Sequence, residues 1–360
     1  MQAAARGERD ALLAWYDANR RDLPWRRTRD PYAVWISEAM LQQTRVETVI
    51  PYWHRFLERF PDVATLASAE LEEVYELWAG LGYYTRARNL SRAAQAVMQR
   101  FGGELPDDAE ALRSLPGIGR YTAGAVASIA FDRQEPVVDG NVERVLARRL
   151  GLRTNVKAPE TAKQIWQEAL QLARGTRPGD LNQALMELGA TLCTPRSPRC
   201  DHCPWSASCS ACAVGDAEQI PRKVPKAAVK KARAVAALVL RRGRALLVRR
   251  PAGSLLGGFW ELPGGEISRG ETPKDALGAR LAERLGLRLL ELRAAGVVKH
   301  TFTHRSLQLH LFAAAALPGR VRLDGYAKHR WMPLAELSGL HTSVLTRKAL
   351  QRLLPGTGET

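Results

Sequence analysis

The chain has 360 residues, enough for two domains of ordinary size, and its 46% hydrophobic and 25% charged residues are typical of a soluble globular protein. No apolar run approaches the ~18 residues of a membrane span, and the first residues, MQAAARGERD, lack the apolar core of a signal peptide, so we expect a cytoplasmic protein. The net charge of +16 favours a polyanionic partner such as nucleic acid, although a basic protein without such a partner has the same composition.

Amphipathic segments fill the chain from Arg6 to about Gly189. Apolar residues recur three and four positions apart, as buried helix faces require, and little in this half alternates like a strand. We therefore predict an all-α domain, with helices within residues 8–20, 30–60, 66–80, 85–102, 141–151, 158–174 and 181–193.

The segment DPYAVWISEAMLQQT places an acid among apolar side chains, since Glu38 shares a helical face with Val34 and Trp35. Burial disfavours the charged form of a carboxyl group and raises its pKa, so Glu38 can hold a proton at neutral pH and act as a general acid. The alternative is a buried structural glutamate that is paired with Arg26 or Arg45.

Two tyrosines, Tyr83 and Tyr84, stand between glycines and arginines in the segment GLGYYTRARNL. Aromatic side chains interleaved with arginine near a turn can stack on bases or wedge between them. The alternative is that both rings pack in the core at helical spacing.

The segment LPGIGRYTAG, residues 115–124, predicts a tight turn between two helices. It lacks the Gly-Lys-Ser/Thr end of a phosphate-binding Walker loop and the strand that precedes a dinucleotide fingerprint. Its turn can instead point backbone N–H groups and a helix N-terminus at a single phosphate. The alternative is a plain helix–helix connector.

Asp139 directly precedes a predicted helix in the segment VVDGNVERVLARRLG. An aspartate at this position commonly serves as a helix N-cap or forms an Asx turn. The local pattern alone therefore assigns Asp139 no chemistry.

All five cysteines lie between Cys193 and Cys212, and four of them follow the spacing Cys193-x6-Cys200-x2-Cys203-x5-Cys209. This clustering indicates a metal or cluster site in a reducing compartment, because a secreted disulfide scaffold would spread its cysteines more widely. Four thiolates suit either an iron–sulfur cluster or tetrahedral zinc, and the pairs 200/203 and 209/212 resemble zinc knuckles.

The pattern changes after the cysteines. IPRKVPKAAVKKAR has six basic residues, two prolines and no acid, which is typical of an extended linker. Beyond it, we expect two strands around an Arg-Gly turn within 234–250, further alternation within 296–317 and a helix within 271–287 that ends at Gly286. We predict a helical domain over residues 1–212, a basic linker over 213–232 and an α+β domain over 233–360.

These motifs occur in the same order in one family. The chain up to about residue 212 resembles the helix-hairpin-helix DNA glycosylases that carry an iron–sulfur cluster, and within them the MutY-type adenine DNA glycosylases, which remove adenine mispaired with 8-oxoguanine. The resemblance extends into the last domain, which is similar to the Nudix fold. It implies a monomer that acts on double-stranded DNA containing A:8-oxoguanine or A:G mispairs.

The resemblance also implies residue roles. Glu38 would protonate a ring nitrogen of the flipped adenine, and Asp139 would stabilise the positive charge that develops on the sugar. Asn141 and Tyr121 would orient the carboxylates and the water. Four cysteines would ligate a 4Fe–4S cluster, namely Cys193, Cys200, Cys203 and Cys209.

Further positions follow from the same resemblance. Gln43 and Tyr83 would pry apart the base stack, since the base must leave the duplex to react. Gly117 and Gly119 would let backbone amides approach a DNA phosphate. The residues expected beside the adenine are Leu23, Trp25, Arg26 and Gln183.

The last domain matches the Nudix box only in part. Residues 265 and 271 fit that motif, but Ala279, Arg280 and Arg284 stand where the motif has Arg, Glu and Glu. The lost carboxylates would normally bind magnesium, so we expect recognition of 8-oxoguanine and no pyrophosphatase activity. The resemblance assigns this recognition to Phe302, Thr303 and His304.

Three other functions would each require a different sequence. An endonuclease III-like enzyme that also cuts the backbone would need a lysine amine where Tyr121 stands. A Nudix hydrolase with a helical DNA-binding appendage would need the intact box. A non-catalytic damage binder would lack Glu38 or Asp139, and both are present.

Overall fold

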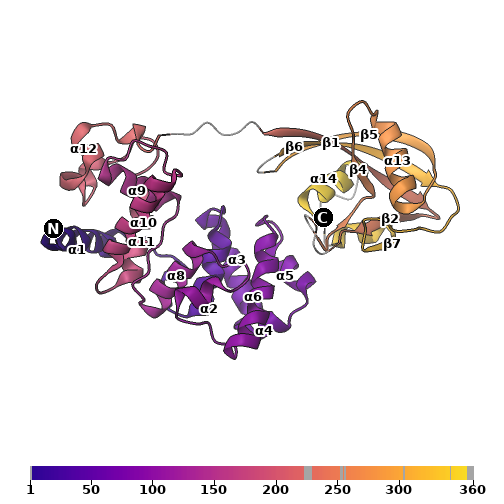
Figure 1. Ribbon diagram of the computed structural model, residues 1–360. Helices are drawn as coiled ribbons and strands as arrows, with labels where there is room; N and C mark the ends of the chain where they lie inside the picture. Colours follow the sequence, from indigo (N-terminus) through magenta and orange to yellow (C-terminus); the bar gives the residue numbers. More distant parts are fainter. Residues whose placement is uncertain are drawn as a thin grey trace. The chain divides into compact units, whose positions relative to one another are not determined.

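The computed structural model describes residues 2–222, 229–251, 254, 257–302, 305–340 and 342–354. The chain divides into two compact units, Met1–Pro225 and Lys226–Thr360. The first unit is built of helices, whereas the second contains a sheet and two long helices (Figure 1). None of the described helices combines the length and the apolar character needed to cross a membrane.

The helices of the first unit follow the amphipathic segments of the sequence and are joined by short turns. They are α1 (Gln2–Asn19), α2 (Pro31–Leu41), α3 (Val46–Arg59), α4 (Val63–Ser68), α5 (Leu71–Trp78), α6 (Thr85–Phe101), α7 (Ala109–Arg113), α8 (Arg120–Phe131), α9 (Gly140–Leu150), α10 (Pro159–Ala173), α11 (Pro178–Thr191) and α12 (Ser210–Val214). Short 3-10 turns lie at η1 (Pro24–Arg26), η2 (Cys200–His202), η3 (Ser206–Ser208) and η4 (Ala217–Gln219).

Helix α2 is buried along almost its whole length. Its sequence is apolar on every side, so it lies inside the unit and packs against α3, α6 and α8 rather than showing a face to solvent. The Asp30 carboxylate accepts hydrogen bonds from the backbone N–H groups of Tyr32 and Ala33, which fixes the start of the helix. This burial carries Glu38 into the interior.

A second core surrounds α11. Apolar side chains of α1, α9, α10 and α11 pack together there with residues of the cysteine-containing loop, among them Trp205 and Ile220. The cysteine loop is therefore part of the hydrophobic core of the first unit.

The helix-turn-helix over α7 and α8 depends on glycine. Gly117 has φ +78°, a left-handed conformation that L side chains rarely adopt, and a Cβ atom there would lie 2.5 Å from the Asn89 Cβ. Gly119 occupies the N-cap of α8, and no side chain caps that helix. The backbone N–H groups of the first turn thus have no side-chain acceptor.

The second unit is a mixed sheet with strand order β3-β2-β1-β6-β5, in which β4 pairs with β1 and β7 pairs with β2. β1 and β6 run parallel and the other pairs antiparallel. β1 begins at Lys230, within the basic segment expected to form a linker. The elements are β1 (Lys230–Arg241), β2 (Arg244–Arg249), β3 (Trp260–Glu261), β4 (Gly264–Glu266), α13 (Pro273–Leu285), β5 (Leu289–Thr301), β6 (Arg305–Ala316), β7 (Lys328–Pro333), η5 (Leu334–Gly339) and α14 (Val344–Leu353).

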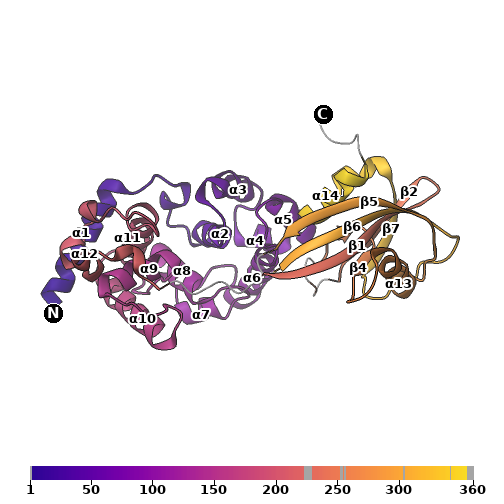
Figure 2. The same cartoon turned by 90° about the horizontal axis from the view of Figure 1, so that it is seen from above.

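The alternation of side chains along β1 builds two cores, one on each face of the sheet. Ala236 and Leu238 belong to the core that includes α14, whereas Ala237 and Val239 belong to the core that includes α13. Figure 2 shows α13 and α14 on opposite faces of the sheet. The predicted fold class, an all-α helix-hairpin-helix domain followed by a Nudix-like α+β domain, is confirmed.

Candidate active site and cluster loop

A cleft of about 800 Å³ opens in the first unit between η1, α2, α8, α9 and α11. Residues that are far apart in the sequence meet in its walls, and almost all of the catalytic and DNA-contacting residues expected in this unit are among them. Those that line the cleft are Leu23, Trp25, Arg26, Glu38, Gln43, Gly117, Gly119, Tyr121, Asp139, Asn141 and Gln183. Tyr83 does not line it.

Glu38 is 4% exposed and accepts a hydrogen bond from a tyrosine. The Tyr121 hydroxyl donates a hydrogen bond to Glu38 Oε2 at 2.7 Å. Burial raises the pKa of Glu38 to about 7, the Tyr121 hydrogen bond opposes this rise, and the nearby Asp139 adds to it. The cleft therefore holds a carboxyl group that still carries a proton near neutral pH.

Tyr121 itself stays protonated. Burial and the neighbouring Glu38 and Asp139 raise the pKa of its hydroxyl well above the ordinary value, so it acts as a hydrogen-bond donor. Its hydroxyl also lies 3.4 Å from Met186 Sδ. Because Tyr121 donates to one oxygen of Glu38, it fixes the orientation of that carboxyl group.

Asp139 caps a helix and faces the cleft at the same time. Its Oδ1 accepts a hydrogen bond of 2.8 Å from the Val142 N–H, and its Oδ2 accepts one of 3.0 Å from Asn141 Nδ2. Asn141 Oδ1 in turn accepts from Arg144 Nη2 at 2.9 Å. The capping role raised from the sequence is correct, and it holds the carboxylate in place beside Glu38.

The sequence did not reveal a buried ion-pair network around Glu187. The Glu187 side chain is fully buried, its oxygens lie 2.7 and 2.8 Å from Arg21 nitrogens, and Arg26 Nη2 lies 2.8 Å from Oε2. Burial works against ionisation, but the two arginines outweigh it and lower the pKa of Glu187 to about 2. Arg26 is thus paired with Glu187 and not with Glu38, which removes one of the two arginines, Arg26 and Arg45, that the alternative for Glu38 named. The only signal in the sequence was an acid within the mostly apolar segment ALMELGA.

Two strained loops lie near the cleft. Gln43 has φ +59° and Tyr83 has φ +48°, conformations that non-glycine residues rarely adopt. Both loops are held by the guanidinium group of Arg86, whose Cζ lies 5.5 Å from the centre of the Tyr83 ring. Arg86 donates to the hydroxyl of Thr44 and to the carbonyl oxygens of Ala39, Met40, Leu81 and Gly82, at 2.6–3.2 Å.

The cysteines of the loop surround one small cavity within the second core. Arg148, 2% exposed, donates to Cys193 Sγ at 3.3 Å and to the Ile220 and Thr194 carbonyl oxygens. A buried cation beside the sulfurs suits an anionic cluster.

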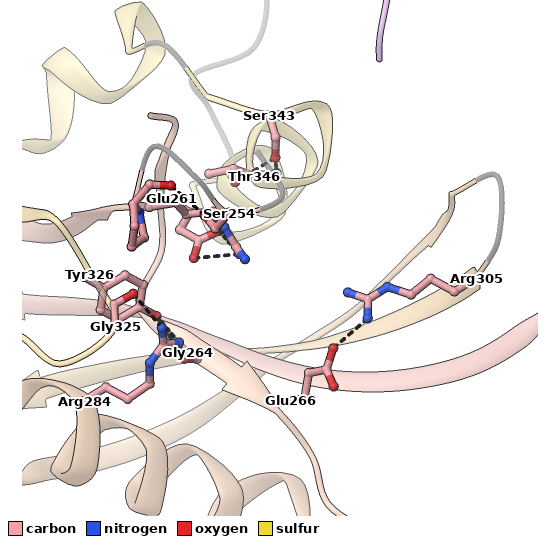
Figure 3. Close-up of polar contacts among 12 residues, drawn as sticks. Ser254, Glu261, Gly264, Glu266, Arg284, Arg305, Gly325, Tyr326, Ser343 and Thr346 are labelled. Atoms are coloured by element: carbon pink, nitrogen blue, oxygen red, sulfur yellow. Dashed lines mark hydrogen bonds and ion pairs between the residues drawn. The ribbon is translucent and has the colours of Figure 1, made fainter. Parts of the chain in front are cut away.

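In the second unit, arginines occupy the place of the Nudix carboxylates. Arg280 forms an ion pair of 3.1 Å with Glu271. Arg284 donates to the Gly264 and Gly325 carbonyl oxygens, each at 3.1 Å, and to the Tyr326 hydroxyl at 2.9 Å (Figure 3). These guanidinium groups leave little negative charge for a magnesium ion.

The expected 8-oxoguanine element is described only in part. Phe302 packs against the sheet core on the α14 side, and its ring lies 4.6 Å from that of His300. Thr303 and His304 lie outside the residues that the structure describes.

Three family models match the chain. Residues 36–171 match the HhH-GPD superfamily of base excision DNA repair proteins, residues 193–209 the iron–sulfur binding domain of endonuclease III, and residues 234–352 the NUDIX domain. The adenine DNA glycosylase of Mus musculus is 38% identical over 399 residues, which cover 95% of this chain and 77% of the mouse protein.

The chain belongs to the adenine DNA glycosylase family. The human member is 38% identical over 409 residues, covering 97% of this chain and 75% of that protein, and the Arabidopsis thaliana member is 41% identical over 347 residues, covering 82% and 55%.

Solved structures agree on the helical fold. A thermostable thymine-DNA glycosylase is 30% identical, covers 59% of this chain and 99% of its own, and superposes with a TM-score of 0.54. Endonuclease III in a non-covalent DNA complex is 23% identical, covers 60% and 98%, and superposes with a TM-score of 0.50. The second similarity concerns the fold alone.

Membership of the family accounts for the cysteine loop. The cofactor of this adenine DNA glycosylase family member is a 4Fe–4S cluster, as predicted. The matched iron–sulfur segment ends at Cys209 and so leaves out Cys212. Because the loop packs in the second core, a cluster held by its cysteines would support the fold of the first unit.

Proposed function

We propose that this DNA N-glycosylase of base excision repair removes adenine opposite 8-oxoguanine or guanine, acts on a flipped base, and stops at the abasic site. One observation carries the proposal: Glu38, with a pKa of about 7, and the Asp139 carboxylate line one cleft. A carboxyl group that can donate a proton and a second carboxyl group in the same cleft are what acid-assisted cleavage of a glycosidic bond needs.

The proton moves from Glu38 to a ring nitrogen of the adenine. Protonation makes the base a better leaving group, so the bond between the base and the sugar weakens and positive charge develops on the sugar. Asp139, held by Val142 and Asn141, stabilises that charge, and water then adds to the sugar and loses a proton, which replaces the proton that Glu38 gave up. Tyr121 keeps one oxygen of Glu38 occupied, which directs the other toward the base.

The base lies against the residues that line the same cleft. Leu23 and Trp25 offer apolar surface, and Arg26 and Gln183 offer polar groups to the adenine edge. Glu187 holds Arg26 in position through their 2.8 Å ion pair. Glu187 therefore acts as a positioning residue for Arg26.

Extrusion of the base is assigned to the strained loops. Gln43 and Tyr83 fill the space that the base leaves, and Arg86 holds both loops in the required conformation. Gly117 and Gly119 let the uncapped start of α8 approach a DNA phosphate.

The remaining assignments concern the cluster and the second unit. The 4Fe–4S ligands are Cys193, Cys200, Cys203 and Cys209. The element that recognises 8-oxoguanine consists of Phe302, Thr303 and His304, and the enzyme acts as a monomer in the cytoplasm.

A lyase step is excluded from the proposal because Tyr121 cannot form a Schiff base. The test is incubation with duplexes that carry A opposite 8-oxoguanine, G or T, followed by gels with and without alkali. We expect strand breaks only after alkali, in the 8-oxoguanine and G duplexes. Breaks that appear before alkali, or no release of adenine, would overturn the proposal.

A further inference from the structure

One arginine of the catalytic cleft has no role in the proposed function. Of the arginines that line the cleft in the described part of the chain, Arg21 and Arg26 pair with Glu187. Arg120, the first residue of α8, lines the same cleft and has neither a hydrogen bond nor an ion pair to any described residue. Arg120 is exposed whereas Glu38 is buried, so Arg120 lies where the cleft opens to solvent.

The guanidinium group of Arg120 is stacked on a tryptophan. Its Cζ lies 3.6 Å from the centre of the ring of Trp166, a residue of α10. This separation is close to van der Waals contact, which favours a guanidinium plane that lies along the ring. Trp166 is partly buried and packs against the second core, so the fold fixes the ring and the ring holds the guanidinium group. The N–H donors along the guanidinium edge stay free and point in a fixed plane.

No acid among the described residues neutralises this cation. Burial lowers the pKa of Arg120, the nearby Arg113 lowers it further, and Glu135 opposes both effects without forming an ion pair. The group stays charged at neutral pH, because the ordinary pKa of arginine is far above 7. Gly119 begins α8 without a side-chain cap, so the positive end of that helix lies beside the cation. The opening of the cleft therefore favours an anion.

A phosphate of DNA fits this position. Its two non-bridging oxygens match the guanidinium fork, which can bind them through two parallel hydrogen bonds. In the proposed function the cleft takes the base and Asp139 faces the sugar, so the adjoining phosphates stay at the opening, where Arg120 lies. A phosphate held this close to the protein needs a partner, because desolvation of an unpaired charge is costly.

We propose that Arg120 binds one of the two phosphates that flank the extruded adenine nucleotide, and that Trp166 is the positioning residue that holds Arg120 in place. This assignment rests on the proposed function, which supplies the nucleotide but gives neither residue a role. A charged contact releases counterions from DNA, so it makes binding depend on salt. If the stack only braced α8 against α10, loss of Arg120 would change stability and leave the salt dependence of binding unchanged.

The first test measures the affinity of the full chain for a duplex with a non-cleavable 2′-fluoro adenine nucleotide opposite 8-oxoguanine, at several salt concentrations. Arg120→Gln should weaken binding about tenfold. The slope of log affinity against log salt should become shallower by about 0.9, the value for one phosphate contact.

Two further substitutions separate orientation from charge. Trp166→Leu leaves the cation but not its platform, so binding should weaken about threefold with an unchanged slope, and Trp166→Phe should restore most of the loss. The matched control is Arg55→Gln, which should leave affinity and slope unchanged. Arg55 is also exposed and stacked, at 4.7 Å from the centre of the Tyr52 ring, but it does not line the cleft.

The second test locates the phosphate. A neutral methylphosphonate replaces, one at a time, the two phosphates that flank the adenine nucleotide. At one of these positions Arg120→Gln should weaken binding at most about twofold, because its partner charge is already gone. A full tenfold loss at both positions, wild-type affinity of Arg120→Gln, or an unchanged salt slope would overturn the inference.

Arg120→Lys keeps the inference falsifiable if Arg120→Gln does not fold. It retains the charge and loses the fork, so the unmodified duplex should bind about threefold more weakly, and the neutral linkage should abolish this difference. A difference that persists at both linkages would contradict the contact. Release of adenine by the wild type separates the two claims: if release occurs while Arg120→Gln binds normally, only the phosphate contact fails, and if release is absent, the proposed function fails whatever the binding shows.

Discussion

Replacing Glu38 by Gln should change how stability depends on pH. The pKa of Glu38 is raised from 4.5 to about 7, so between these values the unfolded chain loses this proton while the folded chain keeps it. The free energy of unfolding of the wild type therefore falls as the pH rises through this window. A shift of this size corresponds to about 3 kcal/mol. The side-chain amide of glutamine does not titrate in this range, so the free energy of unfolding of the variant does not fall for this reason.

The assay is denaturant unfolding of wild type and variant at about pH 5 and pH 8, followed by tryptophan fluorescence. Relative to the wild type, Glu38→Gln should gain stability at the higher pH by an amount approaching 3 kcal/mol. Glu187→Gln is the control, because the pKa of Glu187 is lowered to about 2. Glu187 is therefore ionised in both states at pH 5 and pH 8, and its contribution to the free energy of unfolding is nearly the same at these two pH values. An identical difference between Glu38→Gln and wild type at the two pH values would refute the raised pKa.

Three other expectations concern separate parts of the first unit. Tyr121→Phe removes the hydrogen bond that lowers the pKa of Glu38, so the alkaline limb of the pH–rate profile should move to higher pH; an unchanged limb would contradict the contact. Arg86→Lys replaces a guanidinium group that reaches five acceptors by a compact ammonium group with about three N–H donors. Base extrusion, measured by 2-aminopurine fluorescence, should therefore slow about tenfold, while duplex affinity should fall less. Equal losses in extrusion and in affinity would contradict the positioning role of Arg86. Cys203→Ser should lose iron and sulfide, whereas Cys212→Ser should retain both; iron loss from the second variant would place Cys212 among the ligands.

Local sequence patterns were sufficient for the elements and for some site chemistry. An acid within an apolar helix pointed to the raised pKa of Glu38, and the cap position of Asp139 was evident from its place before a helix. Gly286 ended α13 as expected, because glycine readily adopts the left-handed conformation at a helix end. These features depend on neighbours within a few residues.

Long-range pairings could not be predicted in the same way. Glu187 meets Arg21 across 166 positions, and neither residue carries a local signal of its partner. Arg86 binds backbone carbonyl oxygens, which every residue has, so its type does not reveal its acceptors. The parallel pairing of β1 with β6 joins strands separated by the intervening β2–β5 segment, and a sequence pattern specifies strands but not such partners.

The central claim is that Glu38 donates the proton that releases adenine. Single-turnover release of adenine from an A:8-oxoguanine duplex, measured for wild type and Glu38→Gln together with duplex affinity, tests it most directly. We expect the variant to bind the duplex normally and to release adenine at least about a hundredfold more slowly. Release at the wild-type rate by Glu38→Gln would contradict the account.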